Sequence, residues 1–301
     1  MPAEYAIETQ DLTKRYGQFE AVHALSLKVA GNQITGFLGR NGAGKSTTIK
    51  MLLAMTHPTS GSGTVLGRRI DIPKENQEMR RHVAYVGEDK QLYAYMTVGE
   101  LIRFTKSFYD DWQLEAEHRL LKQYQLPLDR KVKALSKGMR TKLALLLALA
   151  RRPELLILDE PSEGLDPVAI EELLQELVAA AGRGTTVFFS SHQIAEVERI
   201  ADRVCMIDRG KLAMDLSLDQ LRLDYRRITL GFATQAPQAD SSFFDPEAIL
   251  HAKTNGRQVT LLARRDADAV LERARELGAV SVEAEPVSLR EVFLETVKGD
   301  D

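Results

Sequence analysis

A glycine-rich segment ending in Lys-Ser lies between a predicted strand and a predicted helix, a setting typical of phosphate binding. The segment has the sequence GRNGAGKS; the strand is expected at residues 34–38 and the helix at residues 47–55. Glycines let backbone N–H groups turn toward phosphate oxygens, and the helix N-terminus adds partial positive charge. The pattern predicts a P-loop that binds a nucleoside triphosphate. Its predicted binding residues are Gly39, Arg40, Asn41, Gly42, Ala43, Gly44, Lys45, Ser46 and Thr47.

Two carboxylates follow an apolar run at residues 155–158, and P-loop chemistry uses such a pair for two separate tasks. The hydroxyl of Ser46 and the carboxylate of Asp159 are predicted ligands of Mg²⁺, which also keeps waters and phosphate oxygens. Lys45 is expected to reach the β- and γ-phosphates, and Glu160 to orient or deprotonate the attacking water. The alternative is that the two acids only end a strand. With the P-loop upstream, the pair predicts nucleotide hydrolysis.

Length and composition set limits on the fold and on the partners. The chain has 301 residues, 44% of them hydrophobic, which gives room for about two domains. Its net charge of −3 gives no global reason to expect a nucleic-acid partner. The longest apolar run, Leu143–Ala150, is far below the roughly 20 residues that span a bilayer, and residues 1–10 lack the pattern of a secretory signal. The single cysteine, Cys205, lies in an apolar segment and fits a reducing cytoplasm.

The order of the predicted elements favours an α/β fold. Short strands that form an antiparallel start are expected at residues 5–9, 22–29, 34–38 and 64–66. Helical spacing begins where Thr97 and Glu100 form a capping box, and it recurs over residues 131–152. The apolar runs at residues 155–158 and 187–189 are typical of strands covered on both faces in a parallel sheet, and a crossover helix is expected between them.

The last quarter of the chain has the pattern of a separate small module. Asn255-Gly256 between two strand-like runs is a strong hairpin signal, and Ser288 with Glu291 caps a last helix. A capping box of the same kind at Ser217 starts a short connecting helix. We therefore expect a nucleotide-binding domain at residues 1–215, a linker helix at residues 216–225 and a small C-terminal α+β accessory module at residues 226–301.

Five motifs follow one another along the chain: GRNGAGKS at 39–46, LSKGM at 135–139, LILDEP at 156–161, GLD at 164–166 and SH at 191–192. This combination resembles the ATP-binding subunit of ABC (ATP-binding cassette) transporters over about residues 4–215. The resemblance implies a P-loop NTPase cassette with a parallel core sheet, an antiparallel β subdomain and a helical subdomain, with ATP and Mg²⁺ as cofactors. It also implies a head-to-tail dimer, in which Ser136 and Gly138 of one chain contact the ATP of the other. Ser136 is equally suited to be an ordinary helix N-cap.

Further residue roles come from the same resemblance. His192 matches the histidine that contacts the γ-phosphate, which makes Glu160, His192 and Lys45 the expected catalytic residues. Tyr16 matches the aromatic residue that stacks on adenine, although a tyrosine packed at a strand turn has the same pattern. Asp166 matches the loop that links the two sites of the dimer, and turn chemistry alone also explains it.

Two departures from the family pattern concern the metal and the signature motif. Glu88 stands where the family commonly has a glutamine, which implies an additional carboxylate at the Mg²⁺ and an altered link to the membrane partner. Lys137 and Met139 replace residues of the commoner Ser-Gly-Gly-Gln sequence. Both variants look similar to bacterial exporter subunits of the drug, antibiotic and lipid type.

The resemblance therefore implies an ATPase subunit that drives a separate transmembrane permease, of the exporter type. It implies a cytoplasmic protein, peripheral on the inner face of the cell membrane, which forms a homodimer or a heterodimer with a second cassette and has no nucleic-acid partner. The alternatives are a non-transport ABC ATPase that acts on ribosomes or DNA, and an importer subunit. The transported substrate is not encoded in these motifs, because the permease would select it.

Overall fold

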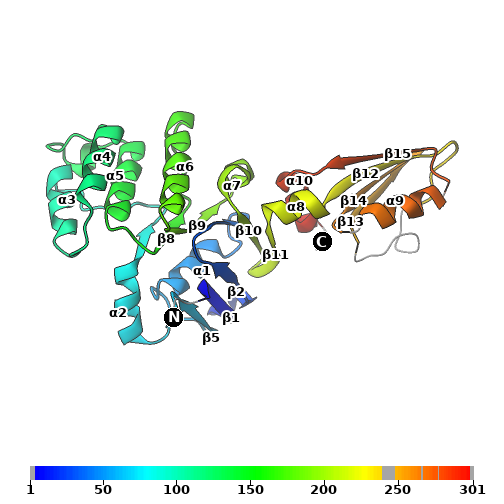
Figure 1. Cartoon of the computed structure of the whole chain (residues 1–301). Coiled ribbons are helices and arrows are strands. Elements are labelled where there is room, and N and C mark those ends of the chain that lie inside the picture. Colours follow the sequence, from blue (N-terminus) through cyan, green and yellow to red (C-terminus); the bar gives the residue numbers. More distant parts are fainter. Residues whose placement is uncertain (1–3, 239–247, 266, 277, 299–301) are drawn as a thin grey trace. The chain divides into compact units, whose positions relative to one another are not determined.

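The chain divides into two units, Met1–Leu212 and Ala213–Asp301, and a six-stranded sheet in the order β11-β10-β4-β9-β8-β7 forms the centre of the first, with its edge strand β11 crossing the boundary after Leu212. This computed structural model describes residues 4–238, 248–265, 267–276 and 278–298 (Figure 1). The strands are β4 (Ile34–Leu38), β7 (Val83–Val86), β8 (Leu155–Asp159), β9 (Thr186–Ser191), β10 (Arg203–Asp208) and β11 (Lys211–Ser217). From β10 to β7 all neighbours are parallel, so the carboxyl ends of these strands meet at one edge of the sheet.

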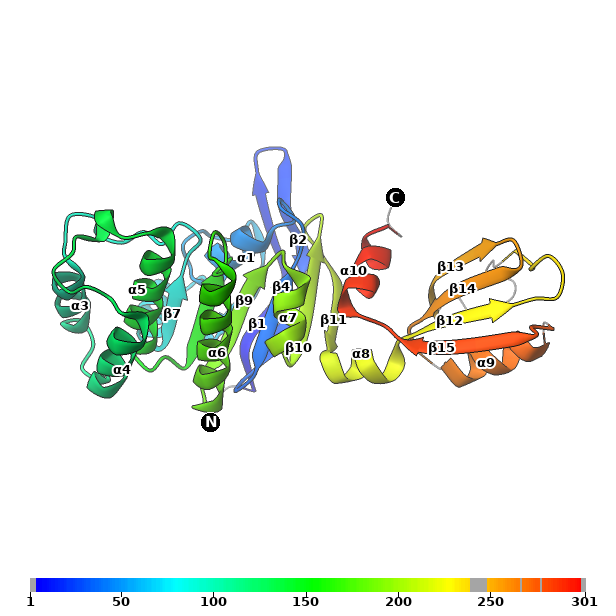
Figure 2. The ribbon, with the colours of Figure 1, turned by 90° about the horizontal axis from the view of Figure 1, so that it is seen from above.

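Helices cover both faces of this sheet, which explains why β4, β8 and β9 are buried throughout. The helix α1 (Lys45–Leu52) packs on one face, and α6 (Pro167–Gly182) and α7 (Ile194–Ile200) pack on the other (Figures 1 and 2). A Cβ atom on Gly36 of β4 would lie 2.3 Å from Cγ1 of Val197. Glycine at this position therefore lets α7 lie close against the sheet.

A second, antiparallel sheet packs over α1. Its strands are β1 (Tyr5–Tyr16), β2 (Phe19–Leu25), β3 (Lys28–Ala30), β5 (Ser60–Val65) and β6 (Arg68–Arg69). The antiparallel start is confirmed for β1, β2 and β5, but the strand expected in it at residues 34–38 is β4 of the parallel sheet, and the expected single strand at residues 22–29 is wrong. The chain is interrupted at Ser26 and Leu27, because the buried Thr9 hydroxyl accepts the Leu27 N–H at 2.9 Å and donates to the Leu25 carbonyl at 2.8 Å.

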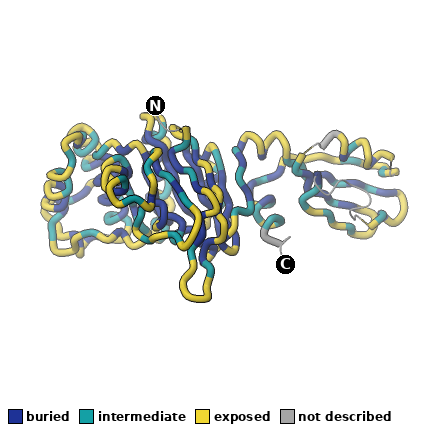
Figure 3. Tube along the Cα trace, turned by 90° about the horizontal axis from the view of Figure 1, so that it is seen from below, coloured by how far each residue is buried: buried dark blue, intermediate teal, exposed yellow. Residues whose placement is uncertain are grey.

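The space between the two sheets holds the main apolar core of this unit. Phe37 from β4 and Phe188 from β9 lie with ring centroids 5.3 Å apart, and both are fully buried. Ile49 of α1 and Cys205 of β10 belong to the same cluster. Figure 3 shows this buried interior in dark blue along the strands. The core therefore fixes the ends of β4, β8 and β9 relative to α1.

A helical part is inserted between β7 and β8. Its elements are α3 (Val98–Lys106), α4 (Leu114–Tyr124), the 3₁₀ turn η1 (Val132–Ala134) and α5 (Lys137–Leu149), whereas α2 (Pro73–His82) leads directly into β7. The capping box of Thr97 and Glu100 at the start of α3 is confirmed. The continuous helix expected at residues 131–152 is wrong. Leu135 is extended, and the Ser136 side chain accepts the Met139 N–H at 3.2 Å, so a new helix begins there.

The second unit contains an antiparallel sheet in the order β13-β14-β12-β15. Its elements are α8 (Leu218–Asp224), β12 (Arg226–Gly231), β13 (Ile249–Asn255), β14 (Gln258–Ala263), α9 (Ala267–Glu276), β15 (Ser281–Pro286) and α10 (Leu289–Lys298). Val270 and Ala274 of α9 pack on Ile228 and Leu230 of β12, which forms a separate core. The Asn255-Gly256 hairpin and the two capping boxes at Ser217 and Ser288 are confirmed. Within the described residues, no helix combines the length and the apolar character needed to cross a bilayer.

Candidate functional site

The glycine-rich loop connects the end of β4 to the start of α1, as the motif predicts. Gly42 and Gly44 have φ angles of 81° and 110°, in the left-handed region that favours glycine. A Cβ atom on Gly44 would lie 2.5 Å from the Ala21 carbonyl oxygen, and one on Gly39 would lie 2.6 Å from the Ile207 carbonyl oxygen. The loop is therefore built against neighbouring backbone, with the N-terminus of α1 at its end.

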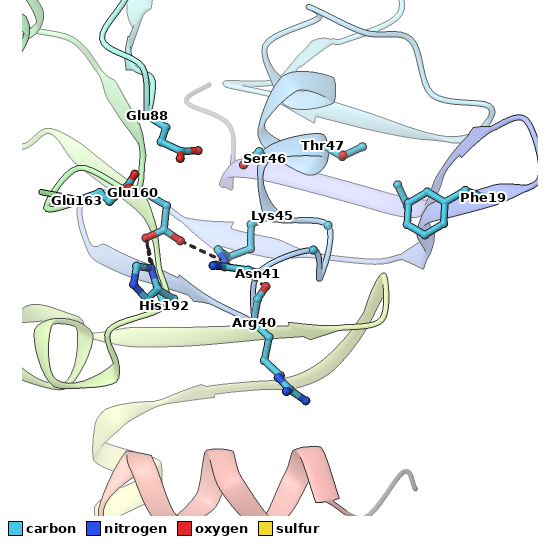
Figure 4. A pocket seen from close by; sticks show the side chains of 13 residues that line it. Phe19, Arg40, Asn41, Lys45, Ser46, Thr47, Glu88, Glu160, Glu163 and His192 are labelled. Carbon is cyan, nitrogen blue, oxygen red and sulfur yellow. Dashed lines mark hydrogen bonds and ion pairs between the residues drawn. The ribbon is translucent and has the colours of Figure 1, made fainter.

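Lys45 lies almost completely buried under this loop, with 5% of its surface exposed. Its Nζ atom donates to the carbonyl oxygens of Gly39 at 2.7 Å and Arg40 at 3.3 Å. The same Nζ lies 3.1 Å from Oε1 of Glu160, in an ion pair that Figure 4 marks with a dashed line. The ammonium group is thus held at the base of the loop by two carbonyl groups and one carboxylate.

The two carboxylates at the end of β8 take different directions. Asp159 is buried, and its Oδ1 accepts the Ser190 hydroxyl at 2.6 Å. Glu160 has a φ angle of 47°, which is unusual for a residue with a side chain. Its N–H donates to Ser190 Oγ at 3.0 Å, so Ser190 of β9 fixes both acids. This turn of the backbone carries the Glu160 side chain toward the loop while Asp159 stays at the strand end.

His192 completes the cluster from the end of β9. Its Nδ1 lies 2.8 Å from Oε2 of Glu160, and its backbone N–H donates to the same oxygen at 3.3 Å. The His192 side chain is 41% exposed, whereas that of Glu160 is 9% exposed. A carboxylate held between an ammonium and an imidazole is suited to accept a proton from water once phosphate replaces its contact with Lys45.

These residues line a cavity of about 500 Å³, which Figure 4 shows from close by. Its lining comprises Phe19, Ala21, Arg40, Asn41, Gly42, Gly44, Lys45, Ser46, Thr47, Glu88, Glu160, Glu163 and His192. Gly39 and Ala43 are buried behind the lining and shape the loop. The size of the cavity and its strand–loop–helix setting suit the phosphates of a nucleotide.

An adjoining cavity of about 420 Å³ contains the three side chains expected near a metal ion. Ser46, Glu88 and Asp159 all line it, and Ser46 and Glu88 line the first cavity as well. Burial raises the pKa of the Glu88 carboxyl group, and the neighbouring Glu163 and Asp159 raise it further. Crowded carboxylates of this kind are stabilised by a cation. This donor set suits Mg²⁺, which is bound by one or two carboxylates together with phosphate oxygens and waters.

The structure places the expected adenine residue beside the cavity lining. Tyr16, which is half exposed, faces Phe19 across the hairpin of β1 and β2. The ammonium of Lys14 lies 5.1 Å from the centroid of the Tyr16 ring, and Phe19, which is 63% exposed, is the aromatic side chain in the described lining. The hairpin therefore presents two aromatic rings near the loop.

The signature segment lies apart from this cavity in the same chain. Ser136 is exposed at the N-cap of α5, and neither Ser136 nor Gly138 is among the described residues that line the cavity. Lys137 Nζ lies 3.6 Å from Oε1 of Glu163, which does line it. Asp166 accepts the Ala169 N–H at 3.0 Å and is the N-cap of α6.

Besides Phe19 and Ala21 of the lining, Ser190, Glu163 and Lys90 lie at the site without having been singled out by the sequence patterns. Ser190 holds Asp159 and Glu160, Glu163 lines the cavity, and the buried Lys90 donates from Nζ to the Glu160 carbonyl oxygen at 3.5 Å. Burial lowers the pKa of the Lys90 ammonium group. The serines that directly follow the apolar run at residues 187–189 are the signal that could have indicated the role of Ser190.

Comparison with known proteins agrees with this arrangement. A protein-family model described as ABC transporter matches residues 22–163. The chain is 38% identical over 224 residues to the bacitracin transport ATP-binding protein BcrA of Bacillus licheniformis, covering 73% of this chain and 72% of that protein. It is 36% identical over 212 residues to the Nod factor export ATP-binding protein I of Burkholderia lata, covering 68% of each.

Among solved structures, an ATP-binding subunit of an ABC transporter superposes with a TM-score of 0.66 and 30% identity, covering 72% of this chain and 92% of that chain. The residues that the family model matches, 22–163, contain the P-loop, β4, β7 and the two acids at the end of β8. The chain therefore belongs to the ATP-binding subunits of ABC transporters and is an ATPase of that family.

Proposed function

We propose that the chain works in pairs, in which each ATP lies between the P-loop cavity of one chain and Ser136 and Gly138 of the other. The distribution of residues within one chain carries this proposal. Lys45, Glu160 and His192 converge on the cavity, whereas Ser136 stands at the exposed N-terminus of α5 outside its lining. A helix N-terminus is a favourable site for a phosphate group. A second copy of the chain is the simplest partner, and a second cassette of the same kind is the alternative.

Each side chain at the cavity has a distinct task in this proposal. Lys45 leaves Glu160 and binds the β- and γ-phosphates, because phosphate oxygens replace the carboxylate as its counter-charge. Glu160, freed from that contact, orients or deprotonates the attacking water. His192 contacts the γ-phosphate and holds the carboxylate in position. The aromatic hairpin at Tyr16 and Phe19 supports the adenine ring by stacking.

A bound Mg²⁺ would neutralise charge that develops on the phosphates during transfer. Ser46, Asp159 and Glu88 would hold it, in agreement with the charge crowding around Glu88. Ser190 keeps Asp159 in place through the 2.6 Å hydrogen bond from its hydroxyl group. Because Glu88 lies two residues after the end of β7, a shift of the metal site would move the chain that leads into the helical part.

The helical part offers a surface for a membrane permease. Tyr93, Tyr95, Phe104 and Phe108 are all exposed, and their rings form a chain of contacts with centroid separations of 5.9, 5.5 and 5.0 Å. Exposed aromatic clusters of this kind are typical of protein interfaces. We infer that they bind a separate transmembrane permease, which would place the chain on the inner face of the cell membrane.

Export is the direction that the relatives support. BcrA is named for bacitracin transport, and the Burkholderia protein for Nod factor export. The variant signature of this chain, with Lys137 and Met139, belongs to the exporter pattern expected from the sequence. We propose export of a compound that is selected by the permease.

The paired arrangement is tested by ATP-dependent dimerisation. Glu160→Gln protein is expected to elute as a dimer with ATP and as a monomer with ADP, because ATP binds but is not consumed. Glu160→Gln combined with Ser136→Arg is expected to stay monomeric while still binding ATP, because the arginine would block the second half of the site. A monomer in ATP for the first variant, with ATP shown to be bound, would contradict the proposal.

A further inference from the structure

A buried carboxyl group joins the two segments that carry Glu160 and His192. Glu196 on α7 is 5% exposed, and its Oε2 accepts the hydroxyl of Ser162 at 2.7 Å and that of Ser191 at 3.2 Å. Both serines are themselves buried, with 2% and 0% exposure. The other oxygen, Oε1, has no hydrogen-bond partner among the described residues. One oxygen atom therefore links two chain segments that are 29 residues apart in sequence.

The two serines occupy positions that matter for hydrolysis. Ser162 lies two residues after Glu160 and directly before the segment Glu163–Asp166, which contains the loop expected to link the two sites of a pair. Ser191 lies directly before His192, and its Oγ also accepts the Gln193 N–H at 2.9 Å. A displacement of the loop would therefore be transmitted through Glu196 to the backbone that carries His192.

The contact is more than a means of filling the core. Burying a carboxyl group with one unpaired oxygen is unfavourable, and an apolar side chain would pack at lower cost. The neighbouring Val197 shows that α7 already has an apolar contact with the sheet, at Gly36. A polar group kept under these conditions fixes one arrangement of its hydrogen-bonded neighbours, since any other arrangement would leave buried hydroxyl groups without an acceptor.

We propose that Glu196 is a positioning residue that couples the loop after Glu160 to His192, so that closure of the pair sets His192 for hydrolysis. This inference rests on the proposed paired function, because the second chain would press on Glu163–Asp166. The loop carries Ser162 with it, Ser162 carries the Glu196 carboxyl group, and Ser191 passes the displacement to His192. ATP binding by a single chain does not require the link, whereas turnover does.

A double-mutant cycle tests this link. Ser162→Ala and Ser191→Ala each break one of the two hydrogen bonds, so each is expected to lower kcat about threefold to tenfold and to change KM by less than about twofold. The double variant is expected to be no slower than the slower single variant, because one break already interrupts the link. Independent effects that multiply in the double variant would overturn the proposal.

Two changes at position 196 supply a separate readout. Glu196→Ala is expected to match the double serine variant in kcat, whereas Glu196→Gln retains an acceptor oxygen and is expected to stay within about twofold of wild type. The control is Glu171→Gln, which removes the exposed ion pair of Glu171 with Arg199 and so also loosens α7 from α6. It is expected to leave kcat unchanged. Thermal unfolding of each variant identifies those that do not fold.

Sizing with ATP separates the hydrogen-bonded link through Glu196 from the pairing of two chains. Each serine variant is also made in the Glu160→Gln background and sized with ATP. Dimers with ATP in all variants, together with the non-multiplying kcat losses, support the link. Dimers with ATP but kcat losses that multiply, or no loss for Glu196→Ala, overturn the link alone. No dimer even for Glu160→Gln by itself would overturn the paired function and the link with it.

Discussion

Replacing Glu160 with glutamine separates the two effects that this side chain has on ATP. In the free chain its carboxylate lies 3.1 Å from Lys45 Nζ and 2.8 Å from His192 Nδ1, and the side chains of Lys45 and Glu160 are only 5% and 9% exposed. Unit charges at the first separation attract by about 5 kcal/mol at an effective dielectric constant of about 20. Incoming phosphates must displace this contact to reach Lys45. The carboxylate therefore competes with ATP for the same ammonium group.

Glutamine keeps the shape of the side chain but removes both its charge and its capacity to accept a proton. Turnover is expected to fall by about 10²–10⁴, the usual contribution of a general base. Most of the gross attraction is offset by desolvation of the two ions, and Lys45 keeps its contacts with the carbonyl groups of Gly39 and Arg40. We therefore expect the free energy of ATP binding to the Glu160→Gln protein to be more favourable by about 1.4 kcal/mol, which corresponds to about tenfold tighter binding.

Equilibrium dialysis with labelled ATP measures the binding, and phosphate release measures the turnover. Glu163→Gln is the matched control: Glu163 lines the same cavity but pairs with Lys137. We expect that control to keep turnover within about threefold, since an exposed ion pair contributes less than about 1 kcal/mol. A Glu160→Gln protein that retains more than about a tenth of the wild-type rate would remove Glu160 from the role of base. Weaker ATP binding by this variant would refute the competition with Lys45.

Four further outcomes follow from the same geometry. Lys45→Ala and Ser136→Arg chains should each be inactive alone and regain part of the activity when mixed, because a mixed pair keeps one intact site. No recovery at any mixing ratio, with mixed pairs shown to form, would mean that each chain works by itself. Glu88→Ala should leave ATP affinity within about threefold, since Ser46 and Asp159 remain to hold the metal; a tenfold loss, about 1.4 kcal/mol, would mean that Glu88 is needed for ATP binding itself. Truncation after Ser217, which keeps β11 whole, should preserve ATP binding but make hydrolysis depend more steeply on protein concentration; superimposable titrations would leave the C-terminal module without a role in assembly. Burial raises the pKa of Glu196 above its usual value of about 4.3, so the folded protein favours the neutral carboxyl group. The stability of the wild type relative to Glu196→Gln should therefore fall as the pH rises through that raised pKa, and thermal unfolding midpoints of the two proteins that change in parallel with pH would contradict this.

The sequence was most informative where one short segment determines its own structure. The P-loop, the Asn255-Gly256 hairpin and the capping box at Thr97 depend on residues that are close in the chain, and all three have the expected geometry. The end of β8 also has the expected structure, because a short apolar run followed by two acids is typical of a buried parallel strand and its carboxyl end.

The errors arise where a distant residue decides the outcome. Thr9 interrupts the strand expected at residues 22–29, because its hydroxyl group binds the Leu25 carbonyl and the Leu27 N–H. Phe19 lines the cavity because the hairpin of β1 and β2 presents it there, which no motif encodes. The link through Glu196 was likewise beyond sequence patterns, since its two hydroxyl donors come from segments that only the fold brings together.

The position of β7 at the edge of the six-stranded sheet has a consequence for how fast its amides exchange with solvent. In the described part of the chain β7 pairs with β8 alone, whereas β4 is hydrogen-bonded on both sides, to β9 and β10. Local opening of an edge strand breaks one ladder, so its amide protons should exchange faster than those of β4. Glu88 lies two residues after the end of this strand. The chain that leads from the nucleotide cavity to the exposed aromatic cluster thus begins at an edge of the sheet, which opens more readily than its centre, and it can move while the P-loop strand stays closed.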